Sequence, residues 1–154
     1  KELSNAAGAK GMVGGQAIDL SAVGQIISQD TLELMHRHKT GALIQASVRL
    51  GALASNHATK QKLEALDHYA QSIGLAFQVQ DDILDVISDT KTLGKQQGSD
   101  IEHGKPTYPA LLGLEEAQRY AQTLKQQALE ALSDFDHKAV HLRQLADYIV
   151  SRNN

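Results

Sequence analysis

The sequence predicts an all-α protein, and two of its features carry that prediction. Aromatic residues make up only 4% of the 154 residues, whereas alanine, leucine, glutamine and isoleucine are abundant, a bias that favours helix over sheet. Apolar residues also recur at helical spacing through several long stretches. A chain of this length fits one domain and can bury a core of its own.

Composition excludes several classes of function. The net charge is −3 and there is no dense run of lysine or arginine, so nucleic acid is not an expected partner. The absence of cysteine excludes disulfides and thiolate chemistry. The seven histidines are scattered, so a zinc site is not expected. No apolar stretch reaches membrane-spanning length and no signal-peptide pattern begins the chain, so a cytoplasmic protein is predicted.

The first twenty residues predict the later part of a helix rich in small residues. Gly11, Gly14 and Gly15 fall within five positions, which indicates a close approach between helices or a kink. A phosphate-binding loop fits less well, because no Gly-Lys-Ser/Thr follows and no strand precedes. The abrupt start leads us to expect further residues upstream of Lys1.

A second helix is predicted from Asp30, as its N-cap, to about Ala54, with Glu33 completing a capping box. Lys39 falls in the middle of its apolar stripe and either extends its ammonium to water or directs it at an anion. Its charge is costly there until an anion arrives, so Lys39→Ala should preserve or slightly raise stability. Thr40 could donate to the same anion or to a carbonyl one turn earlier. The predicted stripe consists of Leu32, Met35, Leu43, Ala46, Leu50 and Leu53.

The stretch from about Thr59 to Ile87 predicts one long helix with an acidic turn, and Gln80 on its apolar side needs a buried partner or the backbone of a neighbouring helix. Carboxylates on one turn repel each other by on the order of 1 kcal/mol per pair, so the turn favours a cation. Mg²⁺ fits best, because carboxylates hold it together with substrate phosphates. A solvated acidic patch is the alternative, which the mostly apolar neighbours disfavour. The polar arc is Gln78, Asp81, Asp82 and Asp85, opposite Leu75, Val79, Ile83, Val86 and Ile87.

Residues 88–109 show no clear period and predict a long loop, which in a compact domain is commonly functional or disordered. Its lysines could close over phosphates held by the acidic turn, although a solvated mobile loop is the alternative. Two packing helices are predicted after it, one over Leu114–Leu132 and one over about Phe135–Ser151. The lysines are Lys91, Lys95 and Lys105, and the last helix is expected to bury Leu142, Leu145 and Ile149.

Several motifs occur in a specific order along the chain. They are Gly11-Met12-x-Gly14-Gly15-Gln16-x-x-Asp19-Leu20, His38-Lys39-Thr40-Gly41, Phe77-Gln78-x-x-Asp81-Asp82-x-x-Asp85, Gly94-Lys95, Gly104-Lys105-Pro106-Thr107-Tyr108-Pro109-Ala110-Leu111 and Leu145-Ala146-Asp147-Tyr148-Ile149. In this order they resemble the C-terminal half of the bacterial farnesyl diphosphate synthases (geranyltranstransferases), which belong to the trans-prenyltransferase, or polyprenyl synthase, family. The resemblance covers essentially the whole chain. It implies that residues 1–154 form the C-terminal part of one all-helical prenyltransferase domain, an isoprenoid-synthase-type bundle.

The resemblance also implies a reaction and roles for individual residues. The family condenses isopentenyl diphosphate with dimethylallyl or geranyl diphosphate to give farnesyl diphosphate, with Mg²⁺ as cofactor, and we expect a homodimer. The metal would be held by Asp81 directly, by Asp82 and Asp85 directly or through water, and by Asp100 through metal-bound water. The diphosphate would be bound by Lys39, Lys95 and Lys105, with Thr40 and Gln78 beside its reactive end; Lys39, Thr40, Gln78 and Asp81 would be the catalytic residues.

The sequence departs from the family pattern in one large respect. The first Asp-rich motif of the family, its isopentenyl diphosphate site and the residues that set product length lie in an N-terminal half that these 154 residues do not contain. We therefore expect this chain alone not to turn over substrate. A longer-chain polyprenyl synthase, a class I terpene cyclase and a non-catalytic helical subunit are the alternative functions.

Overall fold

The computed structural model describes residues 1–55, 57–93 and 106–152, with the side chains of 89–93 left out, and no strand occurs in these ranges. The prediction of an all-α protein is thereby confirmed. The helices are α1 (Glu2–Ala7), α2 (Met12–Ala22), α3 (Gln29–His36), α4 (Ala42–Leu53), α5 (Lys60–Leu93), α7 (Tyr108–Leu112), α8 (Leu114–Ala131) and α9 (Val140–Ser151). A π-helical turn, η1 (Arg37–Gly41), joins α3 to α4, and a 3₁₀ turn, η2 (His137–Ala139), precedes α9.

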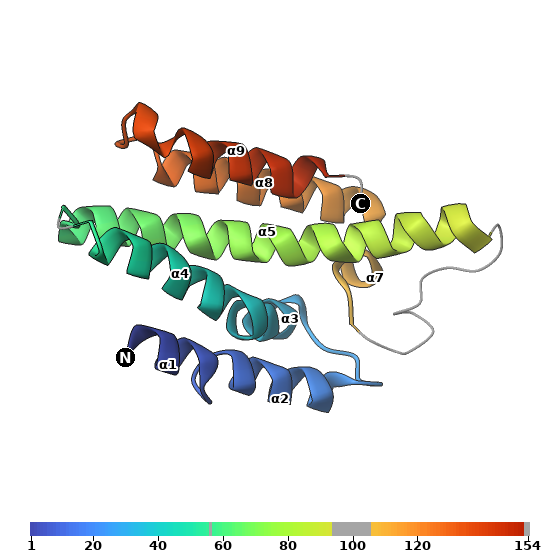
Figure 1. Ribbon diagram of the computed structural model, residues 1–154. Helices are drawn as coiled ribbons and strands as arrows, with labels where there is room; N and C mark the ends of the chain where they lie inside the picture. The colour runs from blue at the N-terminus through green and yellow to red at the C-terminus, as the bar shows by residue number, and fades with distance from the viewer. Residues whose placement is uncertain (56, 94–105, 153–154) are drawn as a thin grey trace.

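The helices are arranged around α5, which runs through the middle of the molecule (Figure 1). Helices α8 and α9 cover one side of α5, whereas α3, η1 and α4 lie on the other side. Helices α1 and α2 form a further layer against η1 and α4. The short helix α7 packs against both α5 and α8. The acidic turn of α5 and the η1 turn therefore belong to neighbouring layers.

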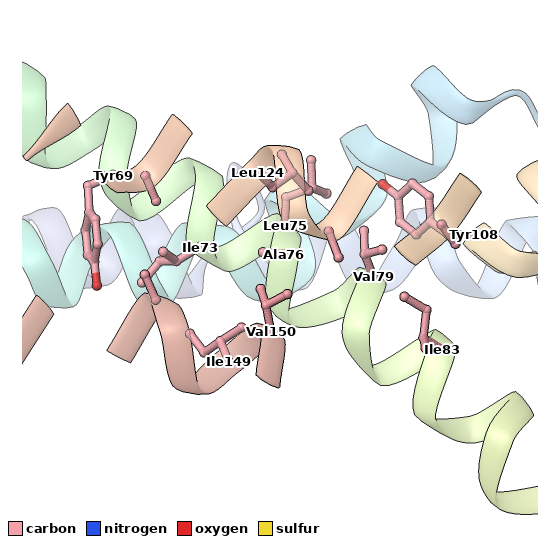
Figure 2. Close-up of a cluster of buried hydrophobic side chains, with 14 of the residues drawn as sticks. Tyr69, Ile73, Leu75, Ala76, Val79, Ile83, Tyr108, Leu124, Ile149 and Val150 are labelled. Atoms are coloured by element: carbon pink, nitrogen blue, oxygen red, sulfur yellow. The ribbon is translucent and has the colours of Figure 1, made fainter. Parts of the chain in front are cut away.

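The apolar side of α5 forms the centre of the core, as the sequence predicts. Leu75, Val79 and Ile83 are each at most 2% exposed, and Figure 2 shows α5 side chains between Leu124 of α8 and Val150 of α9. Alanines let α8 approach α5 closely, because a small side chain keeps the two backbones near each other. The buried residues of α8 are Ala117, Ala121, Leu124 and Ala128.

The predicted start of the second helix is wrong by two residues. Ser28 is the N-cap, and its hydroxyl accepts the N–H of Thr31 at 3.2 Å, whereas Asp30 lies inside the first turn. Glu33 does not complete a capping box; it accepts from Arg37 one turn later and from the hydroxyl of Tyr120 on α8 at 2.9 Å.

The predicted apolar stripe of this helix holds only in part. Leu32, Met35 and Ala46 are buried, but Leu50 is 41% and Leu53 is 46% exposed. The helix from Gln29 is not continuous, because η1 replaces the α-helical bonds with wider ones. An extra residue in one turn changes the face on which later residues lie, so a stripe drawn for an uninterrupted α-helix misplaces Leu50 and Leu53 beyond η1, although Ala46 remains buried.

Two other predicted boundaries and one burial prediction are also corrected. Helix α5 ends at Leu93, six residues beyond the predicted Ile87, and α7 begins at Tyr108, so the interval predicted as a loop is partly helical. The last helix begins at Val140, and Leu145 is 44% exposed, whereas Ile149 is buried as predicted.

In the parts of the chain that the structure describes, no helix is long and apolar enough to cross a membrane.

Candidate functional site

The acidic turn lies at the boundary between the core and the surface. Asp81, Asp82 and Asp85 are all half-buried on the polar side of α5. Asp81 accepts a hydrogen bond from Nε2 of Gln78 at 3.2 Å, and Oδ2 of Asp82 accepts the backbone N–H of Tyr108 at 2.9 Å. The first carboxylate therefore faces a polar side chain of its own helix, while the second holds the start of α7.

The residue that follows α9 supplies a cation to the acidic turn. The guanidinium of Arg152 forms an ion pair with Asp81, donates to the carbonyl of Phe77 at 3.4 Å and lies 4.3 Å from the centre of the Phe77 ring. The carbonyl of Arg152 accepts from Nε2 of the buried Gln80 at 3.1 Å. The predicted partner of Gln80 is thus a backbone carbonyl, and Arg152 reduces the mutual repulsion of the carboxylates.

Lys39 lies in η1 and forms an ion pair with Asp19, a partner that the sequence did not predict. Its Nζ lies 2.6 Å from Oδ2 of Asp19 on α2. The Lys39 side chain is 34% exposed and that of Asp19 is 15% exposed. The expectation that Lys39→Ala preserves or raises stability is therefore wrong in its premise, because the ammonium already has a charged partner and its removal would leave Asp19 unpaired.

A chain of hydrogen bonds joins η1 to the acidic turn. The hydroxyl of Thr40 donates to Oε1 of Gln78 at 2.9 Å, and Nε2 of Gln78 donates to Asp81. The hydroxyl of Thr40 therefore does not donate to a carbonyl one turn earlier, which was the alternative to an anion. The structure does bring Thr40, Gln78 and Asp81 together, and Lys39 is the neighbour of Thr40 in the same turn. A π-helical turn is a frequent feature of functional sites.

His36 forms the buried wall beneath these residues. It is 7% exposed, and its ring stacks on that of Tyr108 with the ring centres 5.8 Å apart. Burial, together with the nearby ammonium of Lys39, lowers the pKa of His36 to about 4, against smaller opposing effects of Gln78 and Asp19. The ring is therefore neutral at pH 7.

The carboxylates of the acidic turn suit Mg²⁺ by chemistry. Within the described residues, no three side chains of the histidine, cysteine or acid type come together to enclose a metal ion. Mg²⁺ does not need such an enclosure, because it retains waters and is bound through one or two carboxylates plus substrate phosphates. Asp81 and its neighbours therefore fit a metal ion shared with a diphosphate. Lys95, Asp100 and Lys105 lie outside the described residues.

Fold and site together define an all-α protein with an acidic turn on its central helix. Residues 4–148 match the family model described as polyprenyl synthetase, and the chain belongs to this family.

Two curated relatives and one solved structure show how far the similarity extends. The chain is 56% identical over 155 residues to farnesyl diphosphate synthase of Escherichia coli, covering 99% of this chain and 52% of that protein. It is 47% identical over 145 residues to geranylgeranyl diphosphate synthase of Cyanophora paradoxa, covering 94% and 48%. A Helicobacter pylori geranyltransferase, complexed with magnesium and isoprenyl diphosphate, superposes with a TM-score of 0.78 at 36% identity, covering 97% and 48%. The chain thus spans about half the length of the relatives it matches.

Proposed function

We propose that the full-length product of the gene that encodes this chain is a prenyltransferase. It condenses isopentenyl diphosphate with dimethylallyl or geranyl diphosphate and yields farnesyl diphosphate. Family membership supports the reaction class, and the similarity to farnesyl diphosphate synthase of Escherichia coli supports the product. The observation that carries the proposal is the hydrogen-bond chain from Thr40 through Gln78 to Asp81, because it links a cation-bearing turn to a carboxylate-bearing one.

In this reaction the allylic C–O bond breaks and the diphosphate leaves with both electrons of that bond. The double bond of isopentenyl diphosphate then attacks the allylic carbon, and the diphosphate takes up the proton that is lost. Negative charge therefore grows on the leaving oxygens, where fixed cations stabilise it most effectively. The ammonium of Lys39 donates hydrogen bonds to these oxygens, while Thr40 and Gln78 lie beside the reactive end of the allylic group.

Magnesium would be held by Asp81, with Asp82 and Asp85 in support, and would supply positive charge beside the leaving diphosphate. For Asp81 to serve in this way, the guanidinium of Arg152 has to give up its ion pair with that carboxylate. Lys95 and Lys105 would contribute further cations to the diphosphate, and Asp100 would bind metal-held water. We further propose a cytoplasmic homodimer, and we propose that this chain is inactive alone.

The product chain length is the point on which a second candidate has support. The 47% identity to a geranylgeranyl diphosphate synthase favours a longer-chain synthase as the alternative. The test is to incubate the full-length gene product with geranyl diphosphate, labelled isopentenyl diphosphate and Mg²⁺. A C15 diphosphate as the main product supports the proposal, and C20 or longer products support the alternative. A cyclic hydrocarbon would instead identify a cyclase, and no product with any allylic substrate would identify a non-catalytic subunit.

A further inference from the structure

Helix α2 approaches the η1 turn so closely that only glycine fits at the contact. A Cβ atom placed on Gly15 would lie 2.2 Å from the backbone nitrogen and 2.6 Å from the Cα of Lys39. Both of these atoms belong to the backbone, so no side chain can move aside to make room. The backbone of α2 therefore rests directly on the residue that carries the ammonium.

Asp19 follows Gly15 by four residues on the same helix. Residues four apart lie on the same face, one turn along the axis, so the contact at Gly15 directs Asp19 towards Lys39. Its Oδ2 lies 2.6 Å from Nζ of Lys39. Lys39 is the chain neighbour of Thr40, whose hydroxyl donates to Oε1 of Gln78 at 2.9 Å, so Asp19 belongs to the same cluster as the proposed site residues.

We propose that Asp19 is a positioning residue that holds the ammonium of Lys39 ready for the allylic diphosphate. This inference rests on the proposed function. A lysine ammonium has three N–H donors on a flexible stem of four carbons. One donor is engaged by Asp19, which fixes the direction of the stem and leaves two donors for phosphate oxygens. The motif Gly15-x-x-x-Asp19 thereby acquires a role beyond the packing that its glycine indicates.

An ion pair that only fastened α2 to η1 would have different consequences, and the chain offers a matched control for that case. Asp67 of α5 forms an ion pair with Arg49 of α4, and its side chain is 18% exposed, close to the 15% of Asp19. The Asp67–Arg49 pair joins α5 to α4 and involves none of the proposed site residues. Asp67→Asn thus measures how the loss of a comparable structural ion pair changes the melting temperature and the kinetic constants.

The experiment uses the full-length gene product and the variants Asp19→Asn, Asp19→Glu and Asp67→Asn. We expect Asp19→Asn to lower kcat/KM for the allylic diphosphate by about tenfold or more and to leave KM for isopentenyl diphosphate unchanged. Asp67→Asn should lower the melting temperature to a similar extent and leave both substrates unaffected. Asp19→Glu should recover part of the loss. Equal kinetic effects of Asp19→Asn and Asp67→Asn would overturn the inference.

A double-mutant cycle gives a second readout. Because Asp19 is proposed to act through Lys39, Asp19→Asn should have no further effect on kcat/KM for the allylic diphosphate in a Lys39→Ala background. Full additivity would contradict the inference.

Calorimetric titration with inorganic diphosphate and Mg²⁺ extends the test to a protein without turnover, since Asp19→Asn should weaken this binding as well. If the wild-type protein shows no turnover, the proposed function is refuted. If Asp19→Asn binds diphosphate as tightly as the wild-type protein, the positioning role is refuted.

Discussion

Replacement of Arg152 by alanine should destabilise the protein, because its side chain fastens the end of the described chain to the acidic turn of α5. The side chain is 14% exposed and makes an ion pair, a cation–π contact and a hydrogen bond to a carbonyl. A hydrogen bond to a charged group contributes about 1.5–3 kcal/mol and a cation–π contact about 0.5–1 kcal/mol. Solvent screens the pair on the Asp81 side, which is 39% exposed. We therefore expect Arg152→Ala to lower the free energy of unfolding by about 2 kcal/mol.

Urea titration of the full-length gene product measures this loss, and Arg119→Ala is the control. Arg119 pairs with Glu115 and Glu116 on the surface of α8, and its side chain is 62% exposed, so its loss should cost less than about 0.5 kcal/mol. The bond between Gln80 and the carbonyl of Arg152 is retained in the variant, so the difference reports on the guanidinium. Equal unfolding free energies for the two variants would show that the Arg152 guanidinium contributes no more than a surface ion pair.

The same variant should bind a divalent metal more tightly when no diphosphate is present. The guanidinium and a metal ion would compete for the carboxylate of Asp81, and a partly exposed ion pair contributes about 0.2–1 kcal/mol. Loss of this competitor should therefore tighten Mn²⁺ binding, measured by electron paramagnetic resonance, by about 1.4- to fivefold. Weaker binding of Mn²⁺ in Arg152→Ala would contradict the competition.

Three further predictions concern the site. Asp81→Asn should reduce kcat more than Asp85→Asn does, because water can replace a supporting ligand in the Mg²⁺ shell more readily than a direct one; equal losses would contradict a direct role. Burial and the ammonium of Lys39 lower the pKa of His36 to about 4. Because the unfolded chain therefore takes up a proton at higher pH than the folded protein, the free energy of unfolding should fall as the pH drops from about 6.5 to 4. This loss should reach on the order of 3 kcal/mol. This pH dependence, measured by urea titration, should be absent in His36→Phe. Lys39→Ala should lower the melting temperature, and the double variant Lys39→Ala/Asp19→Asn should recover part of that decrease. An unchanged melting temperature in Lys39→Ala would show that the ion pair contributes nothing to stability.

The all-α class, the long helix α5 and its buried face could be predicted from the sequence, because periodicity over a long stretch depends on many residues at once. The apolar side of α5 and the need of Gln80 for a partner both follow from this periodicity. The start of α3 could not be predicted in the same way. Ser28 and Asp30 are both good N-cap residues, and local preference does not decide between them.

The π turn and the partners of the charged groups depend on contacts between distant segments. Lys39 lies 20 residues from Asp19, and Asp81 lies 71 residues from Arg152. Periodicity along one helix carries no information about such pairs. The spacing of Gly15 and Asp19 is the one local signal that could have revealed the Lys39–Asp19 pair. That signal is usable only when it is known that Gly15 contacts η1.

The proposed site joins η1 to the acidic turn of α5 and holds a diphosphate together with a metal ion. A crystal structure of the full-length gene product with Mn²⁺ and an unreactive allylic diphosphate analogue tests it most directly, since anomalous scattering locates the metal. We predict an Mn²⁺ ion about 2.1 Å from a carboxylate oxygen of Asp81. Nζ of Lys39 should lie within hydrogen-bond distance of a phosphate oxygen, and Arg152 should be displaced from Asp81. A diphosphate bound away from both turns, with the Asp81–Arg152 pair intact, would show that η1 and the acidic turn do not form this site.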